Sequence, residues 1–171
     1  EYIIGRLKDA KRYLEAAHPS KTRNLFLGLI QLETGNYNSA CENLESALAH
    51  EKKPTGFHVS FAKALLLAGN SNKANEVIKL LETDENFKAD VEFLKGLSKD
   101  IDKDLDGALE HYERALELNP LHTGALFRKA FVLDLMGEDD AAIELYEKCL
   151  TLKPVPVNAV INLGLLYEDK G

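Results

Sequence analysis

A 34-residue period constrains the fold of this chain more than any other feature. It runs from Lys21 to Gly171. In units started every 34 residues from Lys21, the eighth position holds glycine or alanine and the twentieth holds alanine. These small residues are Gly28, Ala62, Gly96, Ala130 and Gly164, and Ala40, Ala74, Ala108 and Ala142. Small residues at fixed positions allow two helices to pack about 8–10 Å apart. The period therefore predicts one helical hairpin per unit, copied along the chain.

Turn-forming residues predict where the helices end. The turn inside each unit holds Gly35, Gly69, Lys103, Gly137 and Gly171. Glycine supplies the positive φ that commonly ends a helix, so Lys103 is the exception. Pro120 and Pro154 bar continuation of two second helices. We expect helices over 3–17, 21–34, 38–50, 56–68, 72–82, 105–118, 122–135 and 139–152, and a last one from 158.

The period divides the chain into units. Residues 1–20 form a helix of a preceding unit or a cap, and 157–171 form the first helix of a truncated fifth unit. Four full units lie between them, at 21–54, 55–88, 89–122 and 123–156.

The unit at 89–122 is irregular. In strict phase, Glu92, Lys95 and Lys99 would occupy packing positions that are apolar in other units. A second stripe at helical spacing is apolar instead and consists of Phe87, Val91, Leu94 and Ile101. We predict a one-residue slip of the helix near 87–100, absorbed in the turn 102–104, which would bring this stripe into the core.

From Lys21 onward the chain resembles the tetratricopeptide repeat family, in its small residues, in Tyr146 and in its prolines. It departs where the family often has an aromatic residue early in the first helix, for example at Glu92. The resemblance implies an all-α, right-handed α-α superhelix of about ten antiparallel helices, a tetratricopeptide repeat solenoid. It also implies a concave face, lined by first helices, that binds a protein segment.

Residues 119–150 and 162–171 also resemble the repeat region of certain bacterial proteins, of the kind known from planctomycetes. These proteins join such repeats to a domain like the C-terminal domain of the RNA polymerase α subunit. This second resemblance implies a role around transcription, with the repeats as the protein-binding part.

Composition excludes several classes of function. The net charge is −7, and residues 89–122 alone carry −5, which disfavours direct nucleic-acid binding. No run of about 18 apolar residues is present, so we expect no membrane span. The two cysteines, Cys41 and Cys149, fall on second helices far apart in the chain and are interpreted as reduced core residues. We expect a cytoplasmic protein.

Patterns that carry catalysis are missing from the sequence. There is no glycine-rich phosphate loop, no paired-cysteine motif and no pair of histidines four residues apart. The five histidines are scattered over different units. We therefore predict no cofactor, no metal and no enzymatic activity in these residues.

The resemblance places a binding groove on the first helices. Its fifth and ninth positions are mostly apolar, Lys63 and Arg128 are its few cations, and an acidic row consists of Asp100, Asp134 and Glu168 at the twelfth position. The predicted groove residues are Leu25, Leu29, Val59, Lys63, Phe93, Leu97, Phe127, Arg128, Phe131, Asp134, Ile161 and Leu165. An apolar floor favours a hydrophobic peptide or helix as the ligand.

Three alternatives stay open at this stage. The protein's own chain could cover the groove in place of a partner. The residues could also be a regulatory module of a larger enzyme. Finally, exposed repeat ends could stack on each other and make the region an oligomerisation element.

Overall fold

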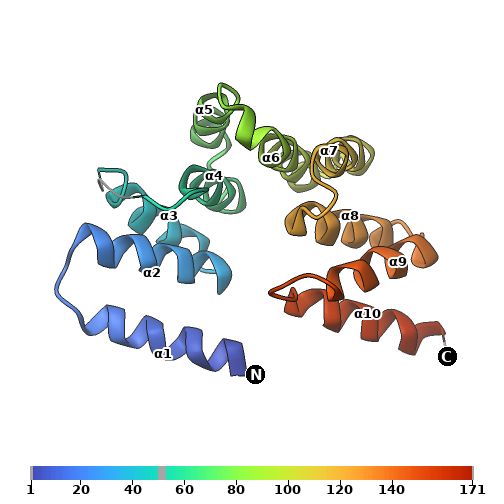
Figure 1. The fold of residues 1–171 in the computed structure, drawn as a ribbon, viewed down its shortest axis with the longest axis horizontal. Coiled ribbons are helices and arrows are strands. Elements are labelled where there is room, and N and C mark those ends of the chain that lie inside the picture. Colours follow the sequence, from blue (N-terminus) through green and yellow to red (C-terminus); the bar gives the residue numbers. More distant parts are fainter. Residues whose placement is uncertain (1, 50–52, 171) are drawn as a thin grey trace. The chain divides into compact units, whose positions relative to one another are not determined.

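The computed structural model describes residues 2–49 and 53–170 (Figure 1). Those residues form ten α-helices, one short 3-10 helix and no strand, which confirms the predicted all-α class. The helices are α1 (Tyr2–Ala16), α2 (Lys21–Glu33), α3 (Tyr37–Ser46), α4 (Phe57–Leu67), α5 (Ser71–Leu81), η1 (Glu85–Phe87), α6 (Lys88–Ile101), α7 (Leu105–Leu118), α8 (Thr123–Leu135), α9 (Asp139–Leu150) and α10 (Val157–Lys170). The predicted end of a helix at residue 50 and the turn position Gly171 lie outside the described residues.

The observed helices begin and end close to the predicted residues, with one exception. The helix expected to reach residue 50 ends at Ser46. A tight turn follows, in which the Leu48 amide donates to the Glu45 carbonyl at 3.0 Å. Three-residue bonds of this kind are common where a helix tightens at its C-terminus.

The turns within the hairpins share one hydrogen-bond pattern, repeated every 34 residues. The Asn36 amide donates to the Gln31 carbonyl at 2.8 Å, and the Glu138 amide donates to the Leu133 carbonyl at 2.9 Å. The turn at 102–104 matches them, because the Asp104 amide donates to the Lys99 carbonyl at 2.9 Å. This six-residue closure ends a helix with one residue in the left-handed region. Lys103 adopts that conformation, with φ 66°, where the other turns hold glycine.

The predicted slip of the helix near 87–100 is therefore wrong. Lys95 and Lys99 keep strict phase but are not packed between helices. Their side chains reach solvent and pair with carboxylates, Lys95 with Glu82 at 2.9 Å and Lys99 with Asp104 at 2.8 Å. Long basic side chains can bury their stems and keep the charged group in water, so the phase tolerates lysine at these positions. Val91 and Leu94 of the alternative stripe are nevertheless buried without any shift.

The chain divides into two compact units, Glu1–Leu80 and Leu81–Gly171. In the first unit α1 packs on α2, α2 on α3, and α3 on α4. Arg23 at the start of α2 donates from Nε to the Leu14 carbonyl at 2.6 Å and so holds the end of α1. Leu44 and Phe61 are among its most buried side chains.

In the second unit each helix from α6 to α10 packs on the next (Figure 1). The small residues allow this close packing. A Cβ at Gly96 would lie 2.7 Å from the Tyr112 ring, so glycine is required where α6 meets α7. Tyr146, Cys149, Ala142 and Leu126 form a continuous buried cluster with the inner face of α10.

Candidate functional site

The predicted groove residues of the first unit are largely enclosed. Leu25 is buried, and Leu29, Val59 and Lys63 are half-buried. The Lys63 ammonium lies 4.0 Å from the Glu33 carboxylate, which already partners its charge. This part of the predicted site offers little free apolar surface to a ligand.

Phe93 and Leu97 of the second unit are buried by the protein itself, at 4% and 1% exposure. The start of α8 covers Phe93, whose ring centroid lies 5.0 Å from that of His122. A Cβ at Gly124 would lie 2.9 Å from the same ring, so the absence of a side chain there makes room for it. These two residues thus support the face from beneath and are not available for contact in this state.

The accessible part of the predicted face lies on α8 and α10. Phe127 and Phe131 are half-buried, and their rings stack with centroids 6.4 Å apart. Ile161 and Leu165 occupy the equivalent positions one unit later and are 53% and 55% exposed. We call these four residues the apolar face.

Beside the apolar face, Asp100 and Arg128 form a buried ion pair. Arg128 on α8 donates to Asp100 on α6 at 2.8 Å, and the Tyr112 hydroxyl donates to the same carboxylate at 3.1 Å. The Arg128 guanidinium also lies 5.5 Å from the centre of the Phe131 ring. Burial raises the pKa of Tyr112 above its ordinary value, so the hydroxyl keeps its proton and remains a donor.

A second arrangement of the same kind lies one unit later. The Tyr146 hydroxyl donates to the Asp134 carboxylate at 3.3 Å, and the Asn162 amide donates to the Tyr146 oxygen at 2.9 Å. Burial raises the pKa of Tyr146 to about 12, which keeps this hydroxyl protonated as well. Asp134, Tyr146 and Asn162 stand 34 residues after Asp100, Tyr112 and Arg128.

These contacts correct the interpretation of the acidic row. Asp100 is buried and holds Arg128, so it presents no open negative charge. Asp134 is half-buried, while Glu168 is exposed on the last helix. Sequence reasoning noted the recurring acids but missed that Tyr112 and Tyr146 hydrogen-bond to two of them. The common 34-residue offset of the acids and the tyrosines could have revealed these pairs.

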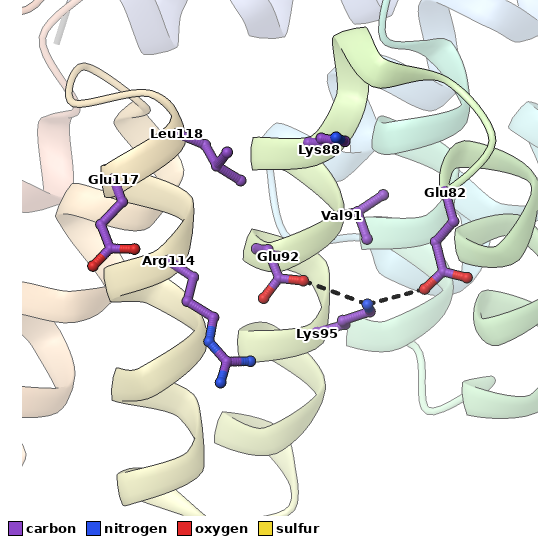
Figure 2. Close-up of a pocket in the computed structure, with 8 residues that line it drawn as sticks. All are labelled: Glu82, Lys88, Val91, Glu92, Lys95, Arg114, Glu117 and Leu118. Carbon is purple, nitrogen blue, oxygen red and sulfur yellow. Dashed lines mark hydrogen bonds and ion pairs between the residues drawn. The ribbon is translucent and has the colours of Figure 1, made fainter.

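A separate hollow of about 520 Å³ lies against α6 and α7 (Figure 2). Its lining combines a small apolar base with charged groups and consists of Glu82, Lys88, Val91, Glu92, Lys95, Arg114, Glu117 and Leu118. Lys95 bridges Glu82 and Glu92, at 2.9 and 3.4 Å. Lys88 pairs with Glu85 and Arg114 with Glu110, so each of its cations already has a carboxylate partner.

Within residues 2–49 and 53–170, no group of three or more His, Cys, Asp or Glu side chains is arranged to hold a metal ion. Over the same residues, no helix is long and apolar enough to cross a membrane. Cys41 and Cys149 are both buried and free. Burial raises the pKa of the Cys149 thiol to about 11, as expected for a core residue and not for a nucleophile.

Solved structures with the same fold cover most of the chain. A thermophilic tetratricopeptide repeat protein of Thermus thermophilus aligns over 97% of this chain and 93% of its own, with a TM-score of 0.66 and 22% identity. The crystal structure of MamA aligns over 85% of each chain, with a TM-score of 0.55 and 27% identity. A sequence model described as "Tetratricopeptide repeat" matches residues 101–166.

The chain carries tetratricopeptide repeats. The solenoid fold predicted from the 34-residue period is thereby confirmed, and these repeats are a general protein-interaction module. A curated relative, an uncharacterised protein of Methanocaldococcus jannaschii, is 40% identical over 55 residues. That match spans 64% of the relative's length and 32% of this chain. The more specific resemblance to polymerase-associated proteins is not shown by these matches and stays a prediction.

Proposed function

We propose that this tetratricopeptide repeat region is a non-catalytic scaffold that binds a peptide or helix of a partner protein. The observation that carries the proposal is the pair of exposed apolar residues Ile161 and Leu165, at the repeat positions held by Phe127 and Phe131 one unit earlier. Together these four side chains form an apolar surface on successive first helices. Such a surface fits an apolar segment of another chain.

The expected energetics suit a reversible interaction. Removing a large apolar side chain from water contributes roughly 1.5–3 kcal/mol. Association and ordering costs consume part of that gain. A partner segment that covers the apolar face is therefore expected to bind with a Kd on the order of micromolar.

The test compares three forms of the protein in pull-downs from the native cell extract. The first is the unchanged chain, and the second carries Ile161→Glu and Leu165→Glu. The control carries Leu121→Glu and Val160→Glu, which add the same charge at residues that are 62% and 50% exposed. Circular dichroism first establishes that all three have equal helicity.

We expect the unchanged chain and the control to capture the same partner, and the Ile161/Leu165 variant to lose it. A partner retained by the Ile161/Leu165 variant would move recognition away from the apolar face. If none of the forms captures a protein at micromolar concentrations, the scaffold proposal fails. A catalytic role in the same residues would instead require an activity that survives in the isolated chain.

A further inference from the structure

The protein contains its own example of how the polar group beside the apolar face is used. Asp100 is buried between α6 and the neighbouring helices and accepts from both Tyr112 and Arg128. The guanidinium reaches it from the next first helix and lies against the Phe131 ring. A carboxylate, a tyrosine hydroxyl and an aromatic ring thus form a receptor for one guanidinium group.

The same receptor recurs one unit later without its guanidinium. Asp134 and Tyr146 repeat the acid and the hydroxyl, with the oxygen atoms 3.3 Å apart. The position equivalent to Arg128 holds Asn162, which is shorter, carries no charge and donates to Tyr146 instead. In the described part of the chain, no lysine, arginine or histidine nitrogen lies within ion-pair distance of Asp134.

The surrounding unit has little positive charge to spare. Residues 81–171 contain 10 lysines and arginines against 20 aspartates and glutamates, a net charge of −10. At least seven of those ten cations are paired with carboxylates, including Arg128, Lys129 and Lys170. A cation for Asp134 therefore has to come from outside the unit.

We propose that Asp134 receives an arginine side chain of the partner segment, in the place that Arg128 occupies on Asp100. This proposal rests on the proposed function and names the partner's chemistry, an arginine next to the apolar residues that cover Ile161 and Leu165. Arginine fits better than lysine because its planar fork can donate two bonds to one carboxylate. Asp134 is half-buried, so solvent screens its charge less than at the open surface.

A displayed library of random twelve-residue peptides is the probe. Selections are run in parallel against the unchanged chain, Asp134→Asn and Asn162→Arg. The Asn162→Arg variant supplies in the same chain the guanidinium that Asn162 lacks, so it should fill the receptor. The Ile161→Glu plus Leu165→Glu variant is the control for the apolar face itself.

We expect the unchanged chain to select peptides with an arginine beside apolar residues, and the Asp134→Asn and Asn162→Arg variants to lose that arginine preference. A selected peptide should bind Asp134→Asn about tenfold more weakly or worse, the size expected for one charge-assisted hydrogen bond. Replacing the peptide's arginine with citrulline, a neutral analogue of the same shape, should give an equal loss. Citrulline should cost nothing further on Asp134→Asn.

Two failures are distinguishable. Peptides that require Ile161 and Leu165 but show no arginine preference would overturn the role of Asp134 and leave the scaffold proposal standing. If binding to the chain is indifferent to the Ile161/Leu165 variant, both proposals fall. Because Asn162→Arg satisfies Asp134, it should also raise the melting temperature, and a lowered one would contradict the equivalence of the two receptors.

Discussion

Gly96 and Gly164 hold the same repeat position but have different neighbours. A Cβ at Gly96 would lie 2.7 Å from the buried Tyr112 ring, whereas nothing lies within 4 Å of one at Gly164. Gly96→Ala should therefore destabilise the protein by about 1–3 kcal/mol through overpacking. Gly164→Ala should stabilise α10 by about 0.5–1 kcal/mol, because alanine loses less backbone entropy in a helix.

Urea unfolding followed by circular dichroism measures both changes, and Gly164→Ala is the matched control for Gly96→Ala. Equal effects at the two glycines would show that helix propensity decides the outcome, and not the contact with Tyr112.

The ion pair of Asp100 and Arg128 should be replaceable as a set but not one residue at a time. Arg128→Met leaves a buried carboxylate without its cation and should cost on the order of 3 kcal/mol. The first unit fills the positions of Asp100 and Tyr112 with Leu32 and Leu44, both buried. Combining Arg128→Met with Asp100→Leu and Tyr112→Phe should thus recover most of the lost stability.

Thermal and urea denaturation of the single and triple variants test this expectation. A triple variant less stable than Arg128→Met alone would mean that the polar network contributes net stability beyond satisfying its own charges.

At the scale of the element, the turn after α6 is the one that departs from its equivalents. Lys103 adopts φ 66°, which glycine tolerates and lysine does not favour. Lys103→Gly should stabilise the protein by about 1 kcal/mol, since a side chain in this region costs roughly 1–2 kcal/mol. Gly137→Ala in the equivalent turn should have the opposite sign, because Gly137 has φ 79° and open space around it. The melting temperatures of the two variants provide the measurement.

Helix boundaries could be predicted because local chemistry sets them. Gly35, Gly69 and Gly137 end helices through their own backbone freedom, so their spacing alone located the turns. The register near 87–100 was mispredicted because Glu92 and Lys95 looked unsuitable for packing positions. Ion pairs with groups distant in sequence, such as Glu92 with His111 at 2.9 Å, make those positions acceptable.

The candidate site was predictable only in part. Repeat phase identified Ile161, Leu165, Phe127 and Phe131, but it could not show that Phe93 is buried, because the covering residues belong to the next helix. The pairing of Asp100 with Arg128 is also a contact across units.

At the scale of the whole molecule, stability in a repeat array comes from neighbouring contacts. Leu44→Ala, at a fully buried position of the first unit, should destabilise the helices around α3 by about 2–5 kcal/mol. Hydrogen exchange should rise in α2 to α4, while the amides of α8 to α10 keep most of their protection. A uniform rise over all ten helices would instead show that the chain unfolds as a single cooperative unit.

The polar networks give the array an obligatory order. Each draws its acid and tyrosine from one hairpin and its third member from the first helix of the next, as in Asp134, Tyr146 and Asn162. A hairpin moved elsewhere by module shuffling would therefore arrive with half a network. The chain behaves as a directional polymer, whose units must be transplanted in adjacent pairs to keep their buried charges compensated.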